Sequence, residues 1–170
     1  MTTLGVVSDT HLPRFGRRLP RALLEGFAAA AVSRILHAGD HTSAFVVDEL
    51  ARIAPVDAVA GNNDDPDLLD RFGTTRVVEV GGARIGLTHG HLGRGSTTPE
   101  RARRLFESDD VDLVVFGHSH QPLWLPADGW SPAMLNPGSP TDRRRGPAFS
   151  FALVDVEDEG IRARIVAFTD

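Results

Sequence analysis

The sequence predicts an α/β fold in which two sheets pack face to face and helices cover their outer sides. In residues 4–66, short apolar runs rich in β-branched side chains alternate with amphipathic helical patterns. This strand-helix-strand-helix-strand order is typical of a parallel sheet. From residue 75 onward strand patterns dominate, with one further helical pattern among them. Each half therefore has an apolar sheet face to bury, and packing sheet on sheet buries both.

In the first half, most of the expected elements have a boundary signal. The first strand covers residues 4–11, and Pro20 at the first helical position begins a helix with Leu23 and Phe27 on its apolar face. The remaining elements are a strand over 33–37, a helix capped by Thr42 or Ser43 and ended by Pro55, a strand over 56–60 and a short helix begun at Asp65 and Pro66.

In the second half, strand patterns at 75–80 and 84–88 flank Gly81 and Gly82, which is typical of a tight hairpin. Thr98, Pro99 and Glu100 begin the next helix. The remaining strands are expected at 112–116, 123–125, 133–135, 148–156 and 161–168. We expect a single domain over residues 1–170, because this length supports one continuous core and no linker interrupts the pattern.

The composition excludes several classes of function. The chain has no cysteine, so disulfides, thiolate catalysis and cysteine-ligated zinc are ruled out. Its net charge of -5 argues against binding nucleic acid by bulk electrostatics. No apolar stretch reaches membrane-spanning length, and the first residues lack the pattern of an export signal. We therefore expect a cytoplasmic protein without membrane contact, and a homo-oligomer is compatible with this.

Polar side chains follow five of the expected strands. Because the carboxyl ends of parallel strands meet at one edge of a sheet, we expect these side chains to lie together. All seven histidines lie in or beside these strand ends, which scattered core or surface histidines would not do. His37 fits a hydrogen-bonded core residue equally well, and His41 fits a helix-entry turn. The strand-end residues are Asp9, His11, Asp40, Asn62, His89, His91, His118 and His120.

Asp9 and His11 begin this series. In extended backbone, residues two apart face the same way, which suits two ligands of one metal ion. The alternative for this pair alone is an aspartate that caps a turn beside a surface histidine. Across the strand ends, four imidazoles, two carboxylates and one amide oxygen are more ligands than one ion needs. They suit two ions that share a bridging carboxylate.

The ligand types indicate both the metal and the reaction. Mixed nitrogen and oxygen ligands suit Mn²⁺, Fe²⁺, Co²⁺, Ni²⁺ or Zn²⁺ better than Mg²⁺ or Ca²⁺, which prefer oxygen alone. Two such ions leave an excess of positive charge that attracts an anion and stabilises charge on phosphoryl oxygens. They also lower the pKa of a shared water, which supplies hydroxide at neutral pH. The residues therefore predict phosphoester hydrolysis.

The motifs that carry this chemistry resemble those of the calcineurin-like metallophosphoesterases, in the same order along nearly the whole chain. They are Asp9-x-His11, Gly39-Asp40, Gly61-Asn62-Asn63-Asp64, His89-Gly90-His91 and Gly117-His118-Ser119-His120. The chain length and the Asn136-Pro137-Gly138-Ser139 segment resemble the compact bacterial and archaeal phosphodiesterase branch. The resemblance implies a four-layer α-β-β-α sandwich of two mixed sheets with a dinuclear metal site.

The resemblance also implies roles for individual residues. Manganese is the expected metal, with nickel, iron, cobalt or zinc as alternatives, and a small phosphodiester or phosphoester is the expected substrate. The implied ligands are Asp9, His11, Asp40 and His120 for the first ion, and the bridging Asp40 with Asn62, His89 and His118 for the second. The implied catalytic residues are Asn62, Asn63, Asp64 and His91, of which Asn62 and His91 would also contact the substrate.

One position departs from the family pattern. Many family phosphatases have a histidine where this chain has Asn63, and that histidine protonates the leaving oxygen. Asn63 cannot donate a proton by titrating, and Asp64 lacks the imidazole that it would orient. Loss of a general acid costs on the order of 10²–10⁴ in rate, and least for good leaving groups. We therefore expect hydrolysis of phosphodiesters, with slow turnover of alkyl monoesters.

The basic runs and the two tryptophans have weaker assignments. The run from Arg143 to Arg145 either receives phosphate, with Arg143 as the binding residue, or forms a solvated loop. The run over 14–21 fits a solvated loop. Trp124 and Trp130 fit core packing or an oligomer contact better than the alternative, in which they flank a substrate ring.

Two other functions compete with phosphodiester hydrolysis. The first is a non-catalytic protein-interaction scaffold, which relatives of this fold become after losing metal ligands. The chain retains every ligand position, which counts against this alternative. The second is a dinuclear amidohydrolase, which has similar ligands but not this order of motifs.

Overall fold

The computed structural model describes residues 1–169, which form two mixed five-stranded sheets and four helices. The strand order is β10-β9-β1-β2-β3 in one sheet and β4-β5-β6-β8-β7 in the other. The strands are β1 (Thr2–Val7), β2 (Arg34–His37), β3 (Val56–Ala58), β4 (Thr75–Val80), β5 (Ala83–Thr88), β6 (Leu113–Val115), β7 (Leu123–Leu125), β8 (Ala133–Asn136), β9 (Phe149–Glu157) and β10 (Gly160–Phe168). The helices are α1 (Arg21–Ala29), α2 (Ala44–Leu50), α3 (Pro66–Phe72) and α4 (Thr98–Arg104).

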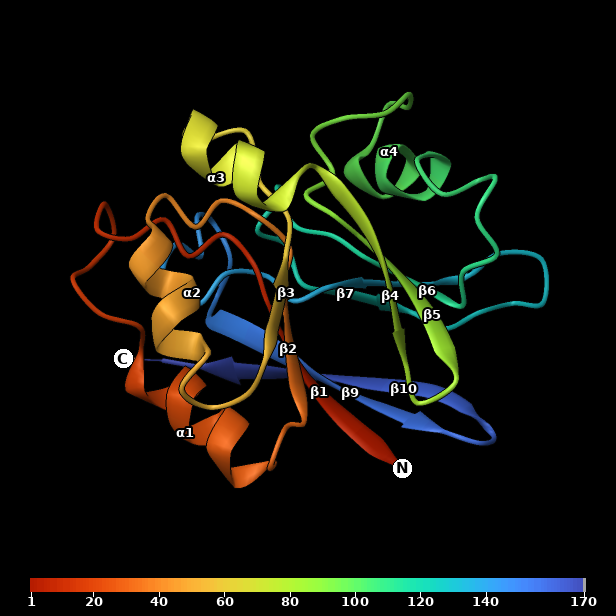
Figure 1. Ribbon diagram of the computed structural model, residues 1–170, viewed down its shortest axis with the longest axis horizontal. Coiled ribbons are helices and arrows are strands. Elements are labelled where there is room, and N and C mark those ends of the chain that lie inside the picture. The colour runs from red at the N-terminus through yellow and green to blue at the C-terminus, as the bar shows by residue number, and fades with distance from the viewer. Residues whose placement is uncertain (170) are drawn as a thin grey trace.

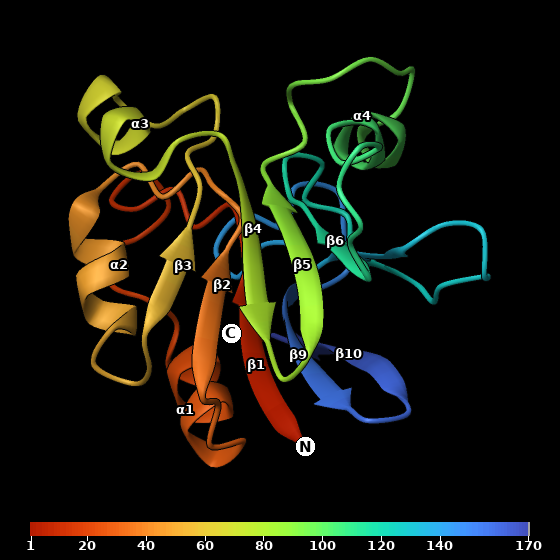
Figure 2. The same ribbon diagram turned by 45° about the vertical axis from the view of Figure 1, so that its right-hand side comes forward.

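The sheets pack face to face between helices, which confirms the predicted four-layer sandwich. Figures 1 and 2 both show α1 and α2 on the side of β1, β2 and β3, and α4 on the opposite side of the molecule, near β5 and β6. Leu4 and Val6 of β1 belong to the core between the sheets, together with Leu87 of β5. Val7 belongs instead to the core beneath the helices, where Phe27 of α1 lies. The alternation of side chains along β1 therefore serves both cores.

Parallel pairing brings the carboxyl ends of strands from both sheets to one edge. β1, β2 and β3 are parallel neighbours, as are β5, β6 and β8. The loops after β1 and β2 are joined by a hydrogen bond from Asp9 N to Gly39 O (3.0 Å). The loops after β5 and β6 are joined by one from Gly117 N to His89 O (3.1 Å). All predicted ligands except Asn62, which follows β3, lie in these loops.

Most element boundaries agree with the sequence prediction, including the Gly81–Gly82 hairpin and the start of α4. Two predictions are wrong. Pro20 is the N-cap of α1, not its first helical residue, and β1 ends at Val7, so that Asp9 and His11 lie beyond the strand. Among residues 1–169, no helix has the length and apolar character that crossing a membrane requires.

Candidate metal centre

Two clusters of buried aspartate and histidine side chains lie at this edge, and Asp9 belongs to both. One cluster contains Asp9, His11 and His120, and the other contains Asp9, Asp40 and His89. In each cluster, one ligand atom from every residue lies within 4.8 Å of the others. The residues come from the loops after β1, β2, β5 and β6, so both sheets contribute to this candidate dinuclear site.

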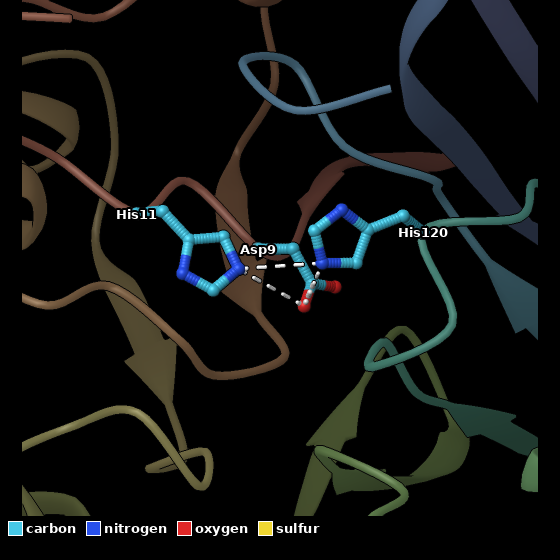
Figure 3. Close-up of side chains that lie close together, drawn as sticks. All are labelled: Asp9, His11 and His120. Atoms are coloured by element: carbon cyan, nitrogen blue, oxygen red, sulfur yellow. Dashed lines mark hydrogen bonds and ion pairs between the residues drawn. The ribbon is translucent and has the colours of Figure 1, made fainter. Parts of the chain in front are cut away.

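In the first cluster, three ligand atoms converge, as Figure 3 shows. The Nε2 atoms of His11 and His120 are 3.3 Å apart. They lie 3.7 Å and 3.2 Å, respectively, from Asp9 Oδ1. Three atoms with lone pairs at these distances leave room for a cation that all of them can contact.

Asp40 belongs to the second cluster and also faces the first. Its Oδ2 atom is 3.6 Å from His11 Nε2 and 3.2 Å from His89 Nε2. Burial raises the pKa of Asp40, but the nearby imidazole of His89 and its charge, together with hydrogen bonds from Asn63, lower it to about 2. An ionised carboxylate with an imidazole on each side is suited to contact two ions at once.

Hydrogen bonds to the far ring nitrogens fix the protonation of two histidines. The Nδ1 atom of His89 lies 2.7 Å from Ala38 O, and that of His120 lies 2.6 Å from Asp142 O. A carbonyl only accepts, so in each case Nδ1 carries the proton and donates it. In the neutral ring, Nε2 then has a free lone pair directed at the aspartates. Metal-binding histidines in proteins usually have this arrangement.

Several of these ligand atoms are buried without a partner. Within residues 1–169, Asp9 Oδ1 and His89 Nε2 have no hydrogen bond, although both residues are fully buried. Burial raises the pKa of Asp9, but the nearby imidazoles of His11 and His120 and the charge of His89 outweigh it, so the carboxyl pKa is strongly lowered. An ionised, unpaired oxygen is costly in a protein interior unless a cation contacts it. The donor set therefore fits divalent ions.

Most of the predicted ligands have strained backbone. Non-glycine residues rarely adopt a left-handed φ, which costs roughly 1–3 kcal/mol each and concentrates at functional sites. Asp9 and His11 direct their side chains into one cluster, as predicted, but the predicted extended backbone is wrong, because both residues have a left-handed φ. Five of the seven predicted ligands have such φ values: Asp9 (55°), His11 (44°), Asp40 (57°), His118 (68°) and His120 (58°).

The sequence analysis missed the hydroxyl groups that support the strained loop after β1. Ser8 Oγ donates to Asp9 Oδ2 (2.7 Å), Ser139 Oγ donates to the backbone oxygen of Asp9 (2.8 Å), and Thr141 Oγ1 donates to the backbone oxygen of Thr10 (2.6 Å). Only Ser139 had a signal, because it lies in the segment that resembles the phosphodiesterase branch. The pattern of hydrophobic residues predicts none of these three hydrogen bonds, and two of them join residues about 130 positions apart.

Two glycines let neighbouring loops approach the carboxylates. A Cβ atom on Gly61 would lie 2.1 Å from Asp40 Oδ1. A Cβ atom on Gly117 would lie 1.9 Å from Ser8 Oγ and 2.6 Å from Asp9 Oδ2. Neither position can have a side chain without displacing an aspartate of the clusters.

Two further predicted residues, His91 and His118, lie beside His89. The ring centroids of His91 and His118 are 5.3 Å and 5.2 Å from that of His89. Burial, followed by the charge of His89, lowers the pKa of His118 to about 4 and also lowers the pKa of His91. Both rings are therefore neutral at neutral pH and have a lone pair available. Asn62 is exposed in the loop after β3.

Asn63 and Asp64 both contact the loop that carries Asp40. Asn63 donates to Asp40 Oδ1 from its backbone (2.8 Å) and to Asp40 Oδ2 from its side chain (2.6 Å). Position 63 has no imidazole, but Asp64 has another imidazole partner, because His41 Nδ1 lies 3.1 Å from Asp64 Oδ2. This pair is fully buried and joins the loops after β2 and β3. His37, also fully buried, accepts from Gly39 N and stacks on His41, as expected of a core residue.

The basic run and the tryptophans are not part of the two clusters, although the basic run directly follows Asp142, whose backbone oxygen contacts His120. Arg143 donates to Gly146 O (2.8 Å) and lies over the Phe149 ring. Trp124 packs against the core between the sheets. Trp130 is 96% exposed, so the suggestion of core packing is wrong for this residue.

The fold and the buried clusters define a metal-dependent phosphoesterase of the calcineurin-like type, and family comparison supports this. The profile of the calcineurin-like phosphoesterase superfamily domain matches residues 2–159. The chain therefore belongs to this superfamily.

Two archaeal relatives and one solved structure are similar to nearly all or most of this chain. A protein of Methanothermobacter thermautotrophicus named "Probable metallophosphoesterase" is 35% identical over 164 residues, which cover 96% of this chain and 91% of the relative. A phosphodiesterase of Methanocaldococcus jannaschii is 29% identical over 152 residues, and the match covers 79% of this chain and 82% of the relative. Vps29 of Entamoeba histolytica, solved with zinc, has a TM-score of 0.77 at 24% identity, with 99% of this chain and 100% of that chain covered. At this identity, the last likeness shows the fold alone.

Proposed function

We propose that this chain hydrolyses phosphodiester bonds with two divalent metal ions held after β1, β2, β3, β5 and β6. The observation that carries the proposal is the buried, unpaired Asp9 Oδ1, which lies within 3.9 Å of the Nε2 atoms of three histidines. An unpaired group of this kind is unfavourable in a packed core, whereas divalent cations between these atoms would pair with it. The archaeal relative named a phosphodiesterase supports a diester as the substrate.

The residues have distinct roles in this proposal. When bound, the ions would stabilise charge on the phosphoryl oxygens and lower the pKa of water in the site. His91, which is neutral, can donate a hydrogen bond to a phosphoryl oxygen, and Asn62 and Arg143 would contact the same group. The first ion would be held by Asp9, His11, Asp40 and His120, and the second by Asp40, Asn62, His89 and His118.

Position 63 would determine which esters react. Hydrolysis joins a water oxygen to phosphorus and breaks the ester P–O bond, so the departing oxygen must leave as an anion or gain a proton. Asn63 has no proton to give by titration, and its amide already donates to Asp40. Aryl oxides leave readily as anions, and alkyl oxides do not. Phosphodiesters with good leaving groups are therefore the preferred substrates, and alkyl monoesters react slowly.

The proposal includes the identity of the metal and the location of the protein in the cell. Manganese suits the mixed nitrogen and oxygen ligands, and nickel, iron, cobalt and zinc are the alternatives. Zinc is among them because imidazole and carboxylate groups are its usual ligands in proteins. Residues 1–170 act as a single domain in the cytoplasm on a small phosphodiester.

The test is metal reconstitution with two kinds of substrate. Protein stripped of metal is assayed with bis-p-nitrophenyl phosphate before and after adding Mn²⁺, Ni²⁺, Fe²⁺, Co²⁺ or Zn²⁺, and glycerol phosphate is assayed as an alkyl monoester. We expect diester hydrolysis only with metal, and its loss in His120→Ala but not in Trp130→Ala. In Asn63→His, monoester hydrolysis should rise at least about tenfold, as part of the 10²–10⁴ that a general acid contributes.

The outcomes separate the parts of the proposal. Absence of diester hydrolysis with every metal contradicts the enzymatic function and favours the interaction scaffold. An unchanged monoester rate in Asn63→His contradicts only the role assigned to position 63.

A further inference from the structure

We propose that Phe15 and Arg14, at the edge of the metal centre, bind the planar base of a nucleoside phosphodiester. The inference rests on the proposed function, because it names the substrate class of the same site. It also makes a separate claim about binding, which can fail while hydrolysis is observed.

Phe15 is an exposed aromatic ring in direct contact with the metal centre. Its ring centroid lies 5.8 Å from that of His11, with the two planes at 81°. His11 Nε2 in turn faces Asp9 and His120. Phe15 is 41% exposed, although a phenylalanine ring is usually buried. A substrate whose phosphate lies at the metal centre therefore passes next to an open apolar ring.

The loop that carries Phe15 is held in place on both sides. Phe15 N donates to His11 O (3.1 Å), and Thr42 Oγ1 donates to Leu12 O (2.7 Å). Leu12 and Leu19, which flank the exposed residues 13–18, are 0% and 4% exposed. The ring is therefore positioned before any ligand arrives, and binding does not have to order the loop.

Arg14 gives this surface its charge and shape. Its guanidinium carbon lies 5.2 Å from the centroid of the Phe15 ring, in cation–π contact. Guanidinium planes and aromatic rings both stack on nucleobases. Arg17 and Arg18 are also exposed in this loop, and a run of charges is unfavourable for a lipid acyl chain. The chemistry therefore favours a flat, polar ring joined to an anion, which describes a nucleoside phosphate.

The test measures how much the base contributes to binding. Manganese-loaded protein is titrated by calorimetry with thymidine 5′-monophosphate and with 2-deoxyribose 5-phosphate, which has the same sugar and phosphate but a hydroxyl group in place of the base. We expect the nucleotide to bind more tightly in the wild type. The ratio of the two affinities should fall at least about fivefold in Phe15→Ala, since stacking on an aromatic side chain contributes roughly 1–3 kcal/mol per base.

Matched variants separate stacking from general damage. Phe15→Trp should keep the ratio, and Trp130→Ala, which removes an exposed aromatic ring in the β7–β8 loop, should not change it. Equal affinities for the two ligands in the wild type overturn the inference, as does a ratio that Phe15→Ala leaves unchanged. The readout is binding, so it holds even if no ester is hydrolysed, and failure of hydrolysis alone counts against the proposed function.

Discussion

The Asp64 carboxylate joins the loops after β2 and β3. Its Oδ2 atom accepts from Asp40 N (2.9 Å), Gly61 N (2.8 Å) and His41 Nδ1 (3.1 Å), and its Oδ1 atom accepts from Thr42 N (2.7 Å). Burial raises the pKa of Asp64, but the hydrogen bonds to this carboxylate and the charge of His41 outweigh burial, so the pKa is lowered. The group is therefore ionised at neutral pH and acts on Asp40 through the backbone.

We predict that Asp64→Asn lowers both stability and metal affinity. An amide nitrogen in place of Oδ2 cannot accept, which leaves buried donors unsatisfied at about 1–3 kcal/mol each. The free energy of unfolding, measured in urea without metal, should fall by about 2–4 kcal/mol. The matched control is Asp65→Asn, because Asp65 caps α3 by accepting from Leu68 N and asparagine caps equally well. Similar unfolding curves for the two variants would contradict the joining role of Asp64.

At the residue scale, the sequence reveals ligand types better than it reveals their supports. Asp9 and Asp40 can be identified as candidate ligands because each follows an apolar run. The carboxyl ends of parallel strands lie at one edge of the sheet, so such residues are expected to lie close together. The direction of Asp9 depends on a φ of 55° and on hydroxyls from residues 8 and 139, which are unrelated in sequence pattern. The resemblance implies that the partner of Asp64 is an imidazole at position 63, directly before it. The imidazole that Asp64 contacts belongs instead to His41, 23 positions away.

Among the helices, α4 supports the loop that carries His91. Thr97 Oγ1 accepts from Glu100 N (3.3 Å), and the Glu100 side chain accepts from Thr97 N (3.2 Å), which forms a capping box. From the same helix, Arg101 donates to Gly90 O (3.2 Å), beside His91. The helix start and this part of the site are therefore connected.

We predict that Thr97→Ala destabilises the protein by about 1 kcal/mol, the usual cost of losing a side-chain N-cap. The control is Ser43→Ala, because Ser43 is the N-cap of α2 but its side chain makes no capping hydrogen bond. That change should stay within about 0.5 kcal/mol of wild type. For both variants, the free energy of unfolding is measured in urea. Equal losses would show that the capping hydrogen bond of Thr97 does not stabilise the protein.

Local elements were predictable and distant pairings were not. The Gly81–Gly82 hairpin joins neighbouring strands, so its turn residues define it. β6 is only three residues long and pairs with β5 and β8, both distant in sequence. Short apolar runs of this kind fit several partners, and only packing of the whole sheet selects one.

At the scale of the whole molecule, the metal centre spans the boundary between the two sheets. Asp9, His11 and Asp40 follow strands of the β1 sheet, and His89 and His120 follow strands of the β5 sheet. Direct links across this boundary at the centre include the hydrogen bond from His118 N to Asp9 Oδ2 (3.0 Å) and that between His89 Nδ1 and Ala38 O. Ions bound here would join the sheets at an edge that otherwise concentrates like charges and unpaired atoms.

We therefore predict that metal stabilises the whole fold. At a free metal concentration 100 times Kd, binding to the folded state alone adds about 2.7 kcal/mol, which corresponds to a rise in Tm of roughly 5–10 °C for a chain of this length. The rise is measured by thermal unfolding with Mn²⁺ and reversed with a chelator. His120→Ala should lose most of it and Trp130→Ala should keep it, because only His120 faces the clusters. Each variant is compared with and without metal, so that its own stability cancels. An equal rise in both variants would mean that the ions bind elsewhere and do not join the sheets.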